Sequence, residues 1–145
     1  MSNIYNLVSE FKRRHPMTIG FRTEKHCKII EKHLNPGEEV FYAFTAQKND
    51  EFYDVFTSCV VVLTNKRILI GQKRLVFGYF FSAITPDMFN DMKVKMGLVW
   101  GRVYIDTVKE KVKFSNIAKK ALPEIETKIT QYMLREKKKY NLNRR

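Results

Sequence analysis

The sequence predicts a mainly β protein of the α+β class: a seven-stranded antiparallel barrel or sandwich, capped by a C-terminal helix and preceded by an N-terminal helical extension. Three observations lead to this prediction. Apolar residues recur at three- and four-residue spacing near both ends of the chain, alternate with polar residues from 40 to 114, and are divided there by short turn sequences. The first spacing is typical of an amphipathic helix and the second of a strand with one buried face. A chain of 145 residues is long enough for one domain with one core.

Two helices are predicted before the first strand. The apolar stripe of the first, over residues 2–14, consists of Ile4, Leu7, Val8 and Phe11, and Pro16 ends it. The second covers about residues 23–34, with Cys27, Ile30 and Leu34 on one face, and Asn35-Pro36-Gly37 stops it. We therefore divide the chain into a helical extension (1–34), a central domain (35–138) and a basic tail (139–145).

The strands are predicted from seven apolar or alternating runs. These are 40–46, 55–63, 68–71, 75–84, 88–96, a run containing Trp100, Val103 and Ile105, and 111–114. Asn65 in the segment Thr64–Arg67 tolerates the positive φ of a tight hairpin, and Pro86 breaks or bulges the ladder. Pro36-Gly37 suits the centre of a type II turn.

A last helix is predicted over about residues 119–138. Its apolar stripe consists of Ile125, Ile129, Tyr132 and Met133. Pro123 is compatible with this helix because it lies near the first turn. We expect the helix to plug or cover the barrel.

Two segments resemble bacterial pleckstrin-homology (PH) domains of the YokE-like group. They are Leu-Asn-Pro-Gly-Glu-Glu-Val at 34–40 and Val-Val-Val-Leu-Thr-Asn-Lys-Arg-Ile-Leu-Ile at 60–70, and the hairpin is the more specific. Residues 97–101, 112–117 and 119–129 look like the closing strands and helix of that group. The resemblance covers about residues 34–134 and implies a PH-like fold that serves as a non-catalytic binding module.

The sequence contains no catalytic motif that we can identify. A Gly-rich phosphate loop, a nucleophile elbow, HExxH and CxxC are all absent. His26 and His33 are seven residues apart, about 10 Å along a helix, which is too far to share one metal ion. Asp87 and Asp91 lack a third acid–base partner in the sequence pattern. We therefore expect no enzyme activity, catalytic residue, cofactor or metal site.

The positive charge is concentrated at the two ends of the chain. Of a formal net charge of +12, residues 1–35 contribute seven Lys/Arg against three Asp/Glu, and residues 117–145 contribute nine against three. The candidate contacts to an anionic partner are Lys12, Arg13, Arg14, Lys66, Arg67, Lys73, Arg74, Lys137, Lys138 and Lys139. The alternative interpretation is a solvated basic surface. For Lys66 and Arg67 we favour a role in specifying the fold, with Arg67 facing solvent.

The loop between the first two predicted strands is not basic. It reads Gln47-Lys48-Asn49-Asp50-Glu51, with Asp54 close behind. PH domains that bind phosphoinositides carry basic residues in this loop, so the resemblance does not extend to that ligand.

The aromatic run 77–81 must place rings on both faces of its strand because side chains alternate. Its candidate apolar contacts are Phe77, Tyr79, Phe80 and Phe81. One face should fill the core. We expect the N-terminal helices to cover the other, with self-association into a homo-oligomer as the alternative.

These observations favour a bacterial, cytoplasmic protein-interaction module. The alternative is peripheral association with an anionic membrane through the basic ends, and nucleic acid is the weaker alternative because the tail has Tyr140 as its single aromatic residue. No apolar run approaches the roughly 20 residues that cross a bilayer. The first 11 residues also lack the order of charges in a signal peptide, so we expect that the chain is not secreted. The identity of the ligand is not encoded in any motif that we recognise.

Overall fold

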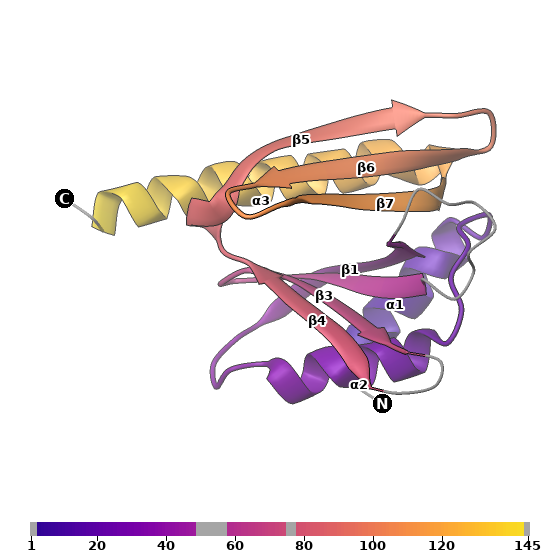
Figure 1. The fold of residues 1–145 in the computed structure, drawn as a ribbon, viewed down its shortest axis with the longest axis horizontal. Coiled ribbons are helices and arrows are strands. Elements are labelled where there is room, and N and C mark those ends of the chain that lie inside the picture. The colour runs from indigo at the N-terminus through magenta and orange to yellow at the C-terminus, as the bar shows by residue number, and fades with distance from the viewer. Residues whose placement is uncertain (1–2, 49–57, 75–77, 144–145) are drawn as a thin grey trace.

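The computed structural model describes residues 3–48, 58–74 and 78–143 (Figure 1). Helices α1 (Asn3–Arg14) and α2 (Thr23–His33) come first, and helix α3 (Leu122–Asn143) comes last. Between them lie β1 (Val40–Gln47), β2 (Ser58–Thr64), β3 (Ile68–Lys73), β4 (Tyr79–Ile84), β5 (Phe89–Met96), β6 (Trp100–Thr107) and β7 (Lys111–Ala118). The short 3-10 helices η2 (Pro86–Met88) and η3 (Lys119–Ala121) precede β5 and α3. The predicted fold class, with seven strands, is confirmed.

The strands form a curled, half-barrel sheet. Its order is β4-β3-β2-β1-β7-β6-β5, and neighbouring strands are antiparallel. Within the described residues, β1 and β7 pair at Gln47 and Ser115, and the two halves of the sheet diverge from that point (Figure 1). The turn at Pro86 forms η2, which carries the chain from one half to the other.

Helix α3 lies between the two halves and fills the inner core. Its side chains Ile125, Ile129 and Met133 pack in one cluster with Phe44 of β1 and Phe114 of β7. Gly101 of β6 allows this approach, because a Cβ atom there would collide with Leu122 at the start of α3. The predicted covering helix is therefore confirmed, including Pro123 in its first turn.

Helices α1 and α2 cover the outer face of β1, β2 and β3 (Figure 1). Their buried residues Ile4, Val8, Cys27 and Ile30 pack with Ala43, Val60, Val62 and Leu69 of the sheet. Because helices lie on both faces, every residue of β2 is buried. Cys27 and Cys59 are buried free thiols.

The C-terminal part of α1 also reaches the inner core. Phe11 has no exposed surface, and its ring lies 6.5 Å from that of Tyr42 and 5.9 Å from that of Phe44. Both of these rings belong to the inner cluster that contains α3. The N-terminal segment thus contributes to the cores on both faces of β1.

Candidate functional site

The basic residues singled out from the sequence lie in separate places. Lys66 and Arg67 precede β3, whereas Lys73 and Arg74 stand at its other end, about 20 Å away for six residues at strand spacing. Lys66 and Arg67 therefore lie apart from Lys73 and Arg74.

The other candidate cations lie on helices. Lys12 donates a hydrogen bond to Gly20 O at 2.9 Å, and Arg13 is exposed beside it at the end of α1. Lys138 is exposed near the end of α3. The side chains of Lys137 and Lys139 lie outside the described residues.

Arg14 is held at a junction of three elements. Its guanidinium lies 3.0 Å from Glu124 at the start of α3, and the Tyr42 hydroxyl of β1 donates to the same carboxylate at 2.7 Å. His15 lies 3.3 Å from the other carboxylate oxygen. Burial alone would raise the pKa of Glu124, but hydrogen bonds from Arg14, Tyr42 and His15 outweigh it and lower the pKa to about 2. This cluster joins α1, β1 and α3.

The expectation that Arg67 faces solvent is wrong. Its side chain is 16% exposed and pairs through Nε with Glu38 Oε2 at 3.0 Å, while the Glu38 side chain is fully buried. A second guanidinium nitrogen donates to His33 O at 2.8 Å, at the end of α2. Burial alone would raise the pKa of Glu38, but hydrogen bonds from Arg67 and from the Thr64 hydroxyl lower it. The favoured role of Arg67 in specifying the fold is consistent with these contacts.

The aromatic run is divided between the two faces of β4. Phe81 stacks on His33 of α2, with ring centroids 4.0 Å apart, and Tyr79 lies beside the same imidazole but remains exposed. Phe80 points toward the inner cluster and lies under the Lys48 ammonium, 3.8 Å away. Phe77 and the acidic loop positions 49–54 lie outside the described residues.

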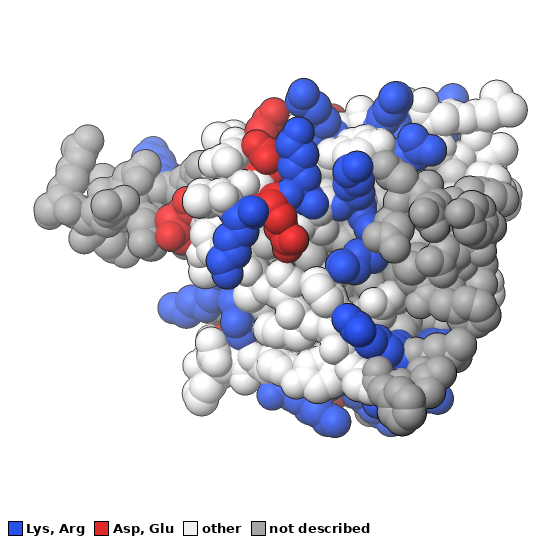
Figure 2. Space-filling model, in the orientation of Figure 1, with Lys and Arg blue, Asp and Glu red and all other residues white. Residues whose placement is uncertain are grey.

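A different set of cations gathers on the outer face of β5, β6 and β7, which is opposite to α3. We call Lys93, Lys95, Arg102, Lys111 and Lys113 the basic face; all five are exposed. They share this side because side chains alternate along a strand, so that Val94, Val103 and Val112 point inward instead. Figure 2 shows Lys and Arg side chains gathered over the region that these strands occupy in Figure 1.

The strand register arranges the basic face in three rows. Lys95 stands opposite Arg102 in the first row. In the second, Tyr104 of β6 stands between Lys93 and Lys113. In the third, Asp106 stands between Asp91 and Lys111, so the face is acidic as well as basic at that end.

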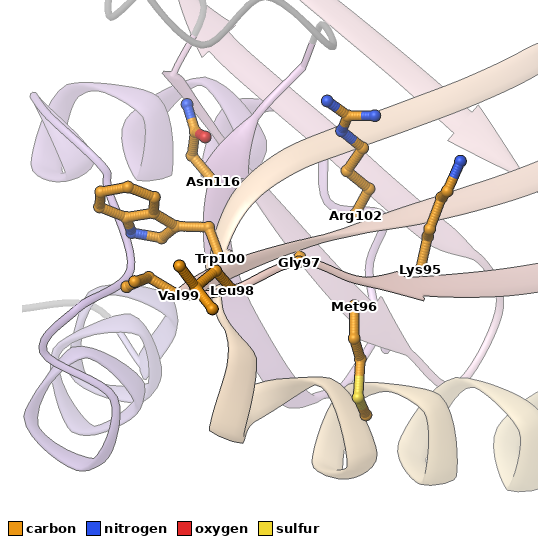
Figure 3. Close-up of a pocket in the computed structure, with 9 residues that line it drawn as sticks. Lys95, Met96, Gly97, Leu98, Val99, Trp100, Arg102 and Asn116 are labelled. Carbon is orange, nitrogen blue, oxygen red and sulfur yellow. The ribbon is translucent and has the colours of Figure 1, made fainter.

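An open hollow of about 410 Å³ continues the first row toward the β5–β6 turn. Lys95 and Arg102 point to one side of it, whereas Met96 points away toward α3 (Figure 3). Arg102 falls at a register shift between β6 and β7, where Asn116 adopts a left-handed φ of 55°. Such a β-bulge redirects side chains and often borders a functional site. The indole of Trp100 is fixed at the wall by a 2.6 Å hydrogen bond to Met17 O.

The turn beside this hollow exposes apolar side chains. Leu98 is 93% exposed, and Met96, Val99 and Met17 are also exposed. We call Met96, Leu98 and Val99 the hairpin tip. Exposed apolar residues that occur singly need no explanation, but a group next to a concave surface is typical of an interaction site.

The basic face was not predicted from the sequence. The signal was present, because the tripeptide Lys-Val-Lys occurs at both 93–95 and 111–113, and each places two lysines on one side of a strand. What the sequence does not state is that β6 joins these two strands, with Arg102 on the same side.

The described residues offer little for metal binding. Among them, no group of three or more His, Cys, Asp or Glu residues could hold a metal ion. His26 is buried and accepts a 2.8 Å hydrogen bond from Lys73 N, and burial lowers its pKa to about 4. None of the described helices is long and apolar enough to cross a membrane.

Comparison with known proteins gives a family match and a similarity to a solved structure. A family model described as "Bacterial PH domain" matches residues 34–131. The curated proteins contain no match. A solved pleckstrin homology domain from Shewanella amazonensis SB2B is 13% identical in sequence, with a TM-score of 0.47, over 79% of this chain and 87% of that chain.

Proposed function

This chain belongs to the bacterial PH domain family, and on that premise we propose that it is a non-catalytic module that binds an acidic segment of a protein partner on the basic face. PH domains are generally interaction modules. The observation that carries the proposal is the alignment of five Lys/Arg side chains on the open side of β5, β6 and β7.

The charge arrangement supports binding rather than folding as the role of this face. Like charges directly opposite each other on neighbouring strands destabilise a sheet, and Lys95 and Arg102 form such a pair. A folded protein tolerates a locally unfavourable arrangement where function requires it. An acidic partner would neutralise the repulsion and would be attracted over a distance.

The third row favours a protein over a uniformly anionic partner. Asp91 and Asp106 stand side by side there, next to Lys111. A nucleic-acid backbone or an anionic bilayer would bring negative charge to all three rows. A polypeptide can instead present carboxylates to the first two rows and a neutral or basic residue to the third.

Fluorescence anisotropy with a labelled Glu/Gly peptide of about 12 residues tests this proposal. We expect binding that weakens as salt concentration rises, and a loss of at least about tenfold in the Lys93→Glu/Lys113→Glu variant. The matched control is Lys28→Glu/Lys32→Glu, which reverses two exposed charges on α2. Equal loss in both variants, or no binding by the wild type, would overturn the proposal. Tighter binding to an oligothymidylate or to phosphatidylserine vesicles would also reject a protein partner.

We also propose that the chain falls in the YokE-like group and acts in the cytoplasm. The segments that carry this resemblance are in contact: Arg67 pairs with Glu38, and the Asn65 side chain accepts a 2.9 Å hydrogen bond from Glu39 N. The first assignment is tested by asking whether members of that group carry both residues of the Glu38–Arg67 pair. Fractionation of expressing cells tests the second, and recovery in the membrane pellet would contradict it.

A further inference from the structure

We propose that the bound segment carries a bulky apolar residue next to its acidic residues, and that the hollow between Arg102 and the hairpin tip receives it. This inference rests on the proposed function, because it assigns a sequence pattern to the same partner. The proposed ligand is an extended peptide whose carboxylates lie on the basic face and whose apolar side chain, at one end of the bound segment, enters the hollow.

The hollow is suited to an apolar group that is flanked by carboxylates. Lys95 and Arg102 line it on the side of the basic face, and Val99 and Trp100 line it on the side of the turn. The indole is immobilised by its hydrogen bond to Met17 O, so this wall is already ordered before a partner arrives. A preordered wall reduces the entropy that binding must remove.

The exposure of the hairpin tip identifies which end of the face is apolar. Leu98 is almost fully in water and Val99 beside it is exposed, whereas the exposed Met96 points to the other side of the sheet (Figure 3). At the opposite end, the row of Asp91, Asp106 and Lys111 is entirely charged. The face therefore changes from apolar to basic to mixed charge along the direction of the strands.

The spacing of the rows sets the spacing of the partner's residues. Lys93 and Lys95 are two residues apart on β5, as are Lys111 and Lys113 on β7, so successive rows lie about 7 Å apart. Side chains on one side of an extended peptide repeat at the same distance. The expected pattern is an apolar residue followed, at alternate positions, by two acidic residues and then a neutral or basic one. Either chain direction satisfies this order.

The experiment compares labelled peptides of equal length and charge by anisotropy, with intact protein. One peptide contains only the acidic residues, with serine at the terminal position. The other two carry leucine there, in the two chain directions. We expect one of the leucine peptides to bind wild-type protein about tenfold more tightly than the serine peptide.

Two variants of exposed leucines show where this gain arises. Leu98→Ser should remove most of the gain and leave binding of the serine peptide unchanged. Leu134→Ser, which alters a 67% exposed leucine on α3, should leave both affinities unchanged. Because both side chains are exposed, neither change should prevent folding, and circular dichroism checks this.

The failures of the two proposals are distinguishable. No binding of any acidic peptide overturns the proposed function and this inference with it. Equal affinity for serine and leucine peptides, or equal effects of Leu98→Ser and Leu134→Ser, overturns the inference alone. If the peptides show no leucine preference while phosphatidylserine vesicles bind in a manner that Leu98→Ser abolishes, the tip contacts a bilayer and the inference is wrong.

Discussion

Lys95 of β5 and Arg102 of β6 stand directly opposite each other in the sheet, and both side chains point to the same exposed side (Figure 3). Like charges directly opposite each other on neighbouring strands repel. The pair makes this surface more attractive to an anion.

Reversing one charge of this pair should therefore affect stability and binding in opposite directions. Lys95→Glu creates a cross-strand ion pair with Arg102, and we expect the free energy of unfolding to rise by about 0.2–1 kcal/mol. The affinity for the acidic peptide should fall. Urea denaturation and anisotropy measure the two effects, with Lys28→Glu as the control. A variant that is both less stable and unchanged in binding would contradict the functional interpretation.

Removing the partner of Glu38 should destabilise the fold. Arg67→Ala leaves a buried carboxylate without its cation and frees the carbonyl of His33, so we expect a loss of about 3 kcal/mol. Chemical denaturation measures it. Lys66→Ala, at the exposed neighbouring position, should change stability by no more than about 0.5 kcal/mol. Similar losses in the two variants would show that the ion pair has no special role.

The cluster around Glu124 should make stability depend on pH. Because the folded-state pKa of Glu124 is about 2, against an ordinary value of 4.5, its contribution is fully present above pH 4.5. The contribution is lost as the pH falls from 4.5 toward 2. Glu124→Gln should cost about 2 kcal/mol at pH 7, and the difference from wild type should shrink over that window. Urea denaturation at several pH values measures the free energy of unfolding of both proteins. A difference between them that stays constant from pH 7 to pH 2 would contradict this account.

Phe11 should bind the N-terminal segment into one cooperative unit with the sheet. Its ring is fully buried against Tyr42 and Phe44, so Phe11→Ala should cost about 3–5 kcal/mol in one unfolding transition. Phe21→Ala, at a half-exposed ring, is the control. Two separate transitions, with only the first shifted, would instead support an independent extension over residues 1–34.

The two cysteines should be unreactive in the folded protein. Burial raises the pKa of both Cys27 and Cys59 to about 12, and thiolate is the reactive form. Reaction with a thiol reagent at pH 8 should be slow until denaturant is added, when both thiols should titrate. Rapid modification of either thiol under native conditions would disagree with its burial.

The sequence predicted the elements better than the surfaces. Each strand has a local signal: the hairpin was found from the short polar segment Thr64–Arg67 between two apolar runs, and the last helix from its apolar stripe. The reason given for the hairpin was wrong in one respect, because Asn65 does not adopt the left-handed φ that we expected there. The burial of Arg67 was not found, because its partner Glu38 is 29 residues away and nothing local distinguishes a paired arginine from a solvated one. Charge counts along the chain drew attention to the two ends, whereas the basic face lies in the middle region.

By itself, the sequence determined which segments are helices and strands, because the spacing of apolar residues repeats within a few neighbouring positions. Only the tertiary structure decided that Lys93, Arg102 and Lys113 share one surface and that Phe11 enters the inner core. The reason is physical. Strand order and register depend on how the whole core packs. Packing brings together residues that are distant in the chain, and no local sequence pattern shows which of them will be neighbours.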